Sequence, residues 1–235
     1  MTGQPLGESL ALQTFLSNYE RQGALVSVVH QDAEAIREHL EERSRSEPGK
    51  EPRFLKERVE KHVKGRAFIH EWHIVMQATF VETYLHDVLV TCAEIDPLLM
   101  KDSKQAATYQ EVMTASSIDE LAAELRSRWA RNFIDRGGPA RWIDRLTRMG
   151  ATGFPPDLAN KLEQMWGIRH VVVHSAGRVT AEFVRRHPTL GFKADQPLTL
   201  SKDPVLDYIR SGVTFVKTTD SFLITRYGPK LSSPV

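Results

Sequence analysis

One long segment that is apolar on nearly every side limits what this chain can fold into. Between residues 67 and 90, large apolar side chains such as Trp72, Phe80 and Leu85 recur around most of the circumference of a helix. A helix that is apolar all round must be central, because neighbouring elements have to cover it on several sides. The sequence therefore predicts a helix over residues 53–92 at the centre of a helical bundle.

The rest of the chain carries helical spacing and helix stop signals. Further helices are predicted over residues 10–43, 116–135, 139–149, 157–177, 180–186 and 203–227, with extended chain near residues 197–200. The predicted fold class is all-α: an antiparallel helical bundle with an N-terminal helical extension and a short irregular or extended segment before the last helix. Two prolines, a glycine and alternating charges predict a loop over residues 44–52. This loop divides the chain into an extension, residues 1–50, and a main helical domain, residues 51–235.

Composition excludes several classes of protein. With 235 residues, 41% apolar and 26% charged, the chain can bury a core and is neither disordered nor fibrous. The net charge of +1 excludes a uniformly basic nucleic-acid binder but allows a local basic patch. The single cysteine, Cys92, excludes disulfides within the chain and metal sites built from several cysteines. No apolar stretch approaches the ~20 residues that span a membrane, and residues 1–7 lack a signal-peptide pattern, so we expect a soluble, cytoplasmic protein without a membrane partner.

The most informative segment is residues 165–177, at the end of one predicted helix. At about 100° per residue, Arg169 falls in the middle of an apolar arc of that helix. The arc holds Leu158, Leu162, Met165 and Val172. An arginine on a core-facing arc is costly unless a carboxylate or a phosphate meets its guanidinium. Glu82, in the most apolar part of the chain, is the carboxylate that we expect to pair with Arg169 and orient it.

Two histidines follow this arginine, one helical turn apart. His170 comes directly after Arg169, and His174 lies in the last turn, where the helix C-terminus favours a protonated imidazole. Histidines at i and i+4 could hold a metal, but no third ligand stands at a useful spacing, so neither a metal nor a cofactor is expected. In a plainer alternative, Arg169 forms a structural salt bridge and His174 is a surface residue.

The spacing Arg169-x4-His174, with His170 after the arginine, resembles the R-x(4–6)-H motif of the HEPN superfamily. Residues 168–177, followed by Glu182-Phe183, are similar to a stretch of bacterial HEPN proteins related to the RiboL-PSP-HEPN group. Residues 80–85 are similar to the earlier central helix of those proteins, which carries an acidic residue. The resemblance covers roughly residues 55–228, and it implies a HEPN-like bundle.

The resemblance implies metal-independent cleavage of RNA. His174 would act as general acid or base, Arg169 would stabilise charge on the phosphate, and His170 would help to orient that phosphate. Imidazole suits proton transfer near neutrality, and guanidinium forks onto phosphate oxygens. The attacking group is the ribose 2′-hydroxyl, so DNA should resist and the cut strand should carry a 2′,3′-cyclic phosphate. The resemblance further implies a homodimer whose two motifs line one cleft, and a bacterial defence or toxin–antitoxin setting with an antitoxin or other defence protein as partner.

Two groups of arginines are candidates for RNA binding. The first, just past the motif, consists of Arg178, Arg185 and Arg186. The second lies between residues 126 and 148, where seven arginines against two aspartates are interleaved with aromatic residues, as on RNA-binding surfaces. The candidates within it are Arg128, Arg131 and Arg141. The alternative is that the two tryptophans of this segment, Trp129 and Trp142, belong to the core while its arginines extend into water.

Other readings of the chain remain open. It could be a non-catalytic HEPN module that binds RNA, nucleotide or a protein partner, or an unrelated helical scaffold or regulator. Convergence of His174 from two chains on one groove would favour the enzyme. The histidines without a motif, among them His70, His73 and His187, are expected to be incidental, and Cys92 is expected to be a core residue rather than a nucleophile.

Overall fold

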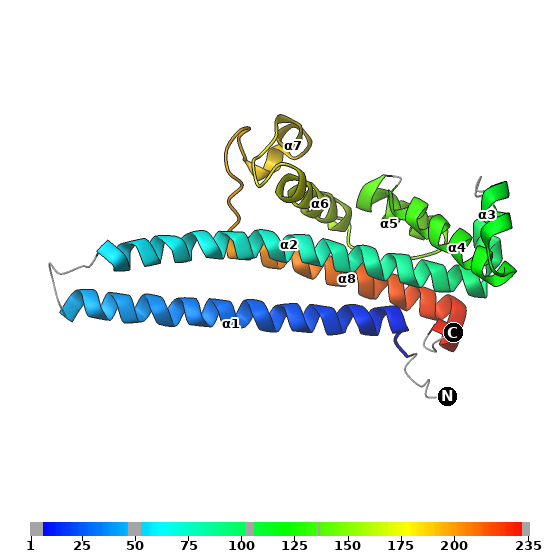
Figure 1. Cartoon of the computed structure of the whole chain (residues 1–235), viewed down its shortest axis with the longest axis horizontal. Helices are drawn as coiled ribbons and strands as arrows, with labels where there is room; N and C mark the ends of the chain where they lie inside the picture. The colour runs from blue at the N-terminus through cyan, green and yellow to red at the C-terminus, as the bar shows by residue number, and fades with distance from the viewer. Residues whose placement is uncertain (1–6, 47–52, 102–105, 136, 232–235) are drawn as a thin grey trace. The chain divides into compact units, whose positions relative to one another are not determined.

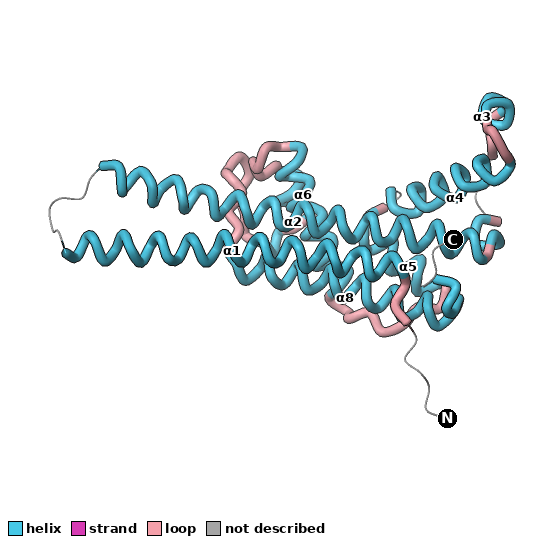
Figure 2. Tube along the Cα trace, turned by 60° about the horizontal axis from the view of Figure 1, so that its bottom comes forward, coloured by secondary structure: helices cyan, strands magenta, loops and turns pink. Residues whose placement is uncertain are grey.

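The computed structural model of the chain describes residues 7–46, 53–101, 106–135 and 137–231. Figure 2 shows helix along most of this described trace and no strand in it. The α-helices are α1 (Leu10–Ser46), α2 (Arg53–Ile95), α3 (Tyr109–Thr114), α4 (Ile118–Asp135), α5 (Gly138–Arg148), α6 (Leu158–His174), α7 (Ala181–Arg186) and α8 (Lys202–Tyr227) (Figure 1). Short 3₁₀ helices cover Pro97–Met100, Pro188–Leu190 and Gly228–Leu231. The predicted all-α helical bundle is confirmed, and within the described ranges no helix has the length and apolar character needed to cross a membrane.

The described chain divides into two compact units. The first unit takes the described residues within 1–17, 78–166 and 210–235, and the second takes those within 18–77 and 167–209. The division falls inside α1, α2, α6 and α8, so each of these helices contributes residues to both units. The predicted boundary between residues 50 and 51 lies outside the described residues and stays a prediction.

Local signals in the sequence place helix ends correctly. At the start of α4, the Ser117 Oγ accepts a hydrogen bond from the Glu120 N–H at 3.1 Å, while the Glu120 carboxylate accepts one from the Ser116 N–H at 2.7 Å. At the end of α6, the N–H groups of Ser175 and Gly177 both donate to the Val171 carbonyl, at 3.0 and 3.1 Å. Gly177 takes a φ of 72°, a left-handed conformation that glycine adopts at low cost. The predicted extended segment is present as an antiparallel bridge between Arg178 and Pro197.

The central role of α2 is confirmed in the first unit, where Val81, Leu85 and Leu89 are fully buried. The second unit departs from the prediction, because Phe68 is 64% exposed. There α2 buries the opposite side of the helix, and this buried side is partly polar. Its members are His70, His73, Ile74 and Gln77.

His70 and His73 are therefore part of the core of the second unit. The Nδ1 of His70 lies 3.0 Å from the Leu200 carbonyl oxygen, and since a carbonyl can only accept, Nδ1 carries the proton. The His73 carbonyl accepts a hydrogen bond from Nε2 of Gln22 on α1 at 3.2 Å. Hydrogen bonding allows these two polar residues to be buried. That they are incidental to function stays a prediction.

A buried carboxylate ties the beginning of α1 to α8 and α2 in the first unit. Asp220 accepts hydrogen bonds from both the backbone N–H and the hydroxyl of Ser9 and, at 3.3 Å, from the hydroxyl of Tyr84. The Ser9 hydroxyl in turn accepts from the Leu12 N–H at 3.0 Å, which caps α1. Burial raises the pKa of Asp220 above its usual 3.8, although the hydrogen bonds from Ser9 and Tyr84 oppose this shift.

Replacing Asp220 with asparagine is expected to lower the free energy of unfolding by about 1–3 kcal/mol. Asparagine replaces one carboxylate oxygen with an NH2 group, which cannot accept a hydrogen bond from Ser9. Folded Asp220 binds its proton more tightly than unfolded Asp220, so its contribution to stability is complete below about pH 4 and declines as the pH rises through the folded pKa. Urea titrations from pH 4 to pH 7 should show the advantage of the wild type over Asp220→Asn shrinking with pH. An advantage that grows with pH would contradict this expectation.

Candidate functional site

The two histidines of the motif lie side by side at the end of α6. Both side chains are exposed, and their ring centroids are 4.6 Å apart. The i, i+4 spacing places them on one face of the helix, and His174 is the last residue of α6. Two accessible imidazoles within one turn can exchange protons with a bound substrate.

Arg169 is partly exposed rather than buried in the core. In the second unit α6 turns Ile168 and Val171 into the core, and both are fully buried. The predicted apolar arc holds in the first unit, where Leu162 and Met165 are fully buried. Each unit thus buries a different arc of α6, and a wheel that assumes one buried arc along the whole helix misplaces Arg169. The guanidinium itself is only partly accessible, because its Nε atom is buried.

The basic residues past the motif belong to the same unit as the motif. Arg178 is exposed, and its Nη1 donates to the Asp195 carbonyl at 2.6 Å. On α7, Arg185 is exposed, while Arg186 pairs with Glu182 one turn earlier at 2.7 Å. Asp195 and Glu182 thus hold the side chains of two of these three predicted RNA-binding residues.

His187 contacts the same helix, which the sequence analysis did not foresee. A Cβ placed on Gly167 of α6 would lie 2.6 Å from the His187 Nε2 and 3.1 Å from Cε2 of Phe183. The His187 ring also lies 5.0 Å from the Phe183 ring. Gly167 precedes His170 by three residues and His174 by seven, so His187 contacts the helix face that carries both motif histidines. Gly167 is a sequence signal for this contact, because a glycine inside a helix is costly and often marks the close approach of another group.

Gly167→Ala is expected to displace the His187 ring while leaving the motif residues unchanged. Alanine normally stabilises a helix by about 1 kcal/mol relative to glycine, but here its Cβ would collide with His187. Gly65→Ala in α2 is the matched control, because a Cβ there meets nothing within 4 Å. Thermal unfolding should show a gain for Gly65→Ala and none for Gly167→Ala, and NMR should show a shift of the His187 ring signals. Equal gains in both variants would contradict the close approach.

Glu82, the predicted partner of Arg169, accepts a hydrogen bond from the indole Nε1 of Trp166 at 2.8 Å. Both residues belong to the first unit, whereas Arg169 belongs to the second. Glu82 therefore has an observed role in holding the indole of Trp166 on α6. Its pairing with Arg169 stays a prediction.

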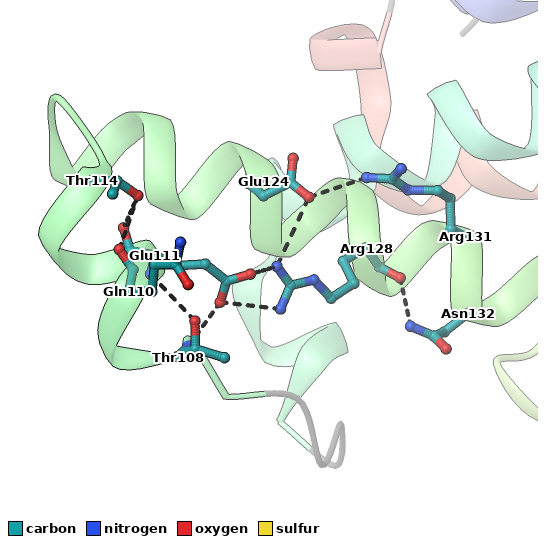
Figure 3. Close-up of polar contacts among 8 residues, drawn as sticks. All are labelled: Thr108, Gln110, Glu111, Thr114, Glu124, Arg128, Arg131 and Asn132. Atoms are coloured by element: carbon teal, nitrogen blue, oxygen red, sulfur yellow. Dashed lines mark hydrogen bonds and ion pairs between the residues drawn. The ribbon is translucent and has the colours of Figure 1, made fainter.

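Arginines of the 126–148 segment take part in contacts within the first unit. Arg128 forms ion pairs with Glu111 and, at 3.9 Å, with Glu124, and Arg131 pairs with the same Glu124 at 3.2 Å (Figure 3). Arg141 is exposed. Arg136 lies outside the described residues.

The aromatic rings of this segment belong to the interior more than to the surface. Trp142 and Phe133 are buried, and Trp129 is partly buried. Arg145 packs over the Phe133 ring at 5.0 Å and donates to the Phe133 carbonyl at 2.9 Å. Rings in these positions cannot stack freely on bases, which favours the reading of core tryptophans with arginines extending into water.

Metal and thiol chemistry receive no support from the side chains that the structure describes. Among them, no group of three or more histidine, cysteine, aspartate or glutamate residues could hold a metal ion. Cys92 is fully buried, and this burial raises the pKa of its thiol to about 12. The thiolate needed for nucleophilic attack is therefore absent at neutral pH.

No family model, no curated protein and no solved structure matches the chain. The HEPN resemblance accordingly rests on Arg169, His170 and His174 and on the residues around them.

Proposed function

We propose that the chain is a metal-independent endoribonuclease of HEPN type whose catalytic residues are Arg169, His170 and His174. One observation carries the proposal: two exposed imidazoles lie 4.6 Å apart at the C-terminal end of α6, next to a partly exposed arginine. An all-α bundle with the motif at a helix end agrees with the fold that the resemblance implies.

In the proposed reaction His174 takes the proton of the ribose 2′-hydroxyl. The 2′-oxygen attacks the adjacent phosphorus, the bond from phosphorus to the 5′-oxygen breaks, and an imidazolium gives a proton to that leaving oxygen. Arg169 holds the phosphate oxygens through its forked N–H groups as negative charge develops on them. His170 orients the phosphate from the adjacent position. The products are a 2′,3′-cyclic phosphate and a 5′-hydroxyl.

The partners are part of the same proposal. The RNA strand would approach over Arg178 and Arg185, which are exposed in the unit that carries the motif. A homodimer that joins two motifs in one cleft, a bacterial defence or toxin–antitoxin setting and an antitoxin partner follow from the HEPN resemblance alone.

The test is incubation of mixed tRNA and a structured RNA with the wild-type protein in excess EDTA. Cleavage should survive EDTA and leave 2′,3′-cyclic phosphate ends, and DNA of the same sequence should stay intact because it lacks the 2′-hydroxyl. Intact RNA in the presence of folded protein would overturn the proposal. Salt-sensitive RNA binding without cleavage would instead identify a non-catalytic HEPN module.

A further inference from the structure

A cavity of about 660 Å³ lies within the second unit, between side chains of α1, α2 and α8. Every residue that lines it falls within 18–77 or 167–209, the residues of this unit. Cavities that hold small organic molecules measure roughly 300–1,000 Å³ and combine an apolar lining with a few polar groups. The volume of this cavity therefore suits one small molecule, and Arg169, His170 and His174 of the proposed ribonuclease site do not line it.

Helix α1 leaves space for the cavity at Gly23. This glycine lines the cavity, and a Cβ placed on it would meet nothing within 4 Å. Val26 and Ser27, three and four residues later, lie on the same side of α1 and line the cavity as well. A glycine inside a helix is unfavourable unless a close contact or a special backbone conformation requires it. Since no described group crowds Gly23, this glycine contributes open space to the cavity.

One wall of the cavity is aliphatic and comes from α8. Val205, Leu206 and Ile209 line the cavity, and two of them, Val205 and Ile209, are buried one helical turn apart on one side of α8. Aliphatic side chains offer no hydrogen bond to water, so the apolar body of an organic molecule is favoured over water along this wall.

The basic groups of the cavity gather where α8 begins. Lys202 lines the cavity and is the first residue of α8. His70 lines it too, and its Nδ1 donates to the carbonyl oxygen of Leu200, which precedes Lys202 by two residues. His73 follows His70 by three residues on the same side of α2, lines the cavity and is 6% exposed. None of these three lining side chains can carry a negative charge, so an anionic group is not repelled at this end of the cavity.

Glu38 is the one carboxylate among the described residues that line the cavity, and it stands far from the basic end. The His73 carbonyl is bonded to Gln22 of α1, and Glu38 follows Gln22 by 16 residues, about 24 Å along the helix axis. Asp203 and Asp207, which follow Lys202 in the sequence, are not part of the lining. The charges of the cavity therefore suit a ligand that carries one negative group, placed where α8 begins.

We propose that this cavity binds a small organic acid with an apolar body, such as a medium-chain fatty acid. The carboxylate lies at the end that carries Lys202, His70 and His73, where an ammonium group and two imidazoles can meet it. The hydrocarbon chain lies along Val205 and Ile209. On this proposal the two histidines take part in binding, in contrast to the expectation from the sequence that they are incidental.

Isothermal titration calorimetry of the full chain with decanoate gives the first test. Decanoate is expected to bind as one molecule per chain, and decan-1-ol, which has the same chain length without the charge, at least about tenfold more weakly. Lys202→Glu is expected to weaken decanoate binding at least about tenfold, because the carboxylate would meet a like charge. Lys193→Glu is the matched control, since Lys193 is an exposed lysine of the same unit that does not line the cavity. Absence of saturable decanoate binding, equal affinity for the alcohol, or an equal loss in both variants would overturn the proposal.

Filling the cavity tests whether decanoate binds there or on another apolar surface. Gly23→Phe places an aromatic ring in open space and should weaken decanoate binding at least about tenfold. Gly65→Phe in α2 is the matched control, because a Cβ there also meets nothing within 4 Å and Gly65 does not line the cavity. Thermal unfolding establishes that both variants fold, and the exposed Lys202 provides the decisive variant if Gly23→Phe does not fold. Decanoate affinity that survives in folded Gly23→Phe would overturn the proposed site.

The binding proposal and the ribonuclease proposal fail separately. Decanoate binding is measured without RNA, and RNA cleavage is measured without decanoate. A chain that binds decanoate and leaves RNA intact retains only the binding proposal, and a chain that cleaves RNA without binding decanoate retains only the ribonuclease proposal.

Discussion

His174→Ala is expected to lower the rate of RNA cleavage at least about 100-fold, the range typical for loss of a general acid or base. The side chain is exposed at the end of α6, so its removal leaves no cavity in the core. The fold and the affinity for RNA should therefore be retained while proton transfer is lost. Arg169→Ala should also reduce cleavage strongly, because the developing phosphate charge would lose its forked donor.

The comparison needs single-turnover cleavage rates measured in EDTA, with circular dichroism to establish that each variant is folded. His39→Ala is a suitable control, because it removes another exposed histidine, on α1, that has no place in the proposed site. Unchanged cleavage in His174→Ala would rule out this histidine as the catalytic group. Cleavage retained in both motif variants would point to a contaminant or to a different site.

Much of the fold follows from local signals in the sequence. The serines before Glu120 cap α4, and Gly177 ends α6 as predicted, because both depend on hydrogen bonds between residues close in the chain. The central α2 is predictable from its apolar pattern. Helix α3 is not, because its six residues bury no side chain and its position depends on Arg128, seventeen residues away from Glu111.

The candidate site, too, is predictable from the sequence only where its geometry depends on residues close together in the chain. The adjacency of His170 and His174 is a consequence of helical spacing and is confirmed. The partial exposure of Arg169 depends on which arc of α6 each unit buries, and this cannot be read from one helix. His187 reaches α6 through tertiary packing on Gly167, twenty residues earlier in the chain. Contacts between distant residues leave no periodic pattern in the sequence. The glycine inside the helix indicates only one of the two contacting residues.

Trp142 is the side chain whose loss should cost the first unit most. It is 1% exposed, its indole Nε1 donates to the Ile134 carbonyl at 2.8 Å, and its ring meets that of Trp166 edge-on at 4.9 Å. Phe215 of α8 adds a third ring, 6.1 Å away. One residue of α5 therefore contacts α4, α6 and α8, and Trp166 continues the chain of contacts to Glu82 on α2.

Trp142→Ala is expected to lower the free energy of unfolding by about 3–5 kcal/mol, because the missing ring leaves a cavity and the Ile134 carbonyl loses its donor. Trp142→Phe keeps an aromatic ring and loses the hydrogen bond, so a smaller loss, about 1–2 kcal/mol, is expected. Urea unfolding followed by far-UV circular dichroism measures both. If alanine costs no more than phenylalanine, the ring contacts contribute little, and the indole N–H would be the main stabilising contact. A larger cost for alanine would place the stability of the first unit in the packing among α5, α6 and α8, which holds Trp166 against Glu82.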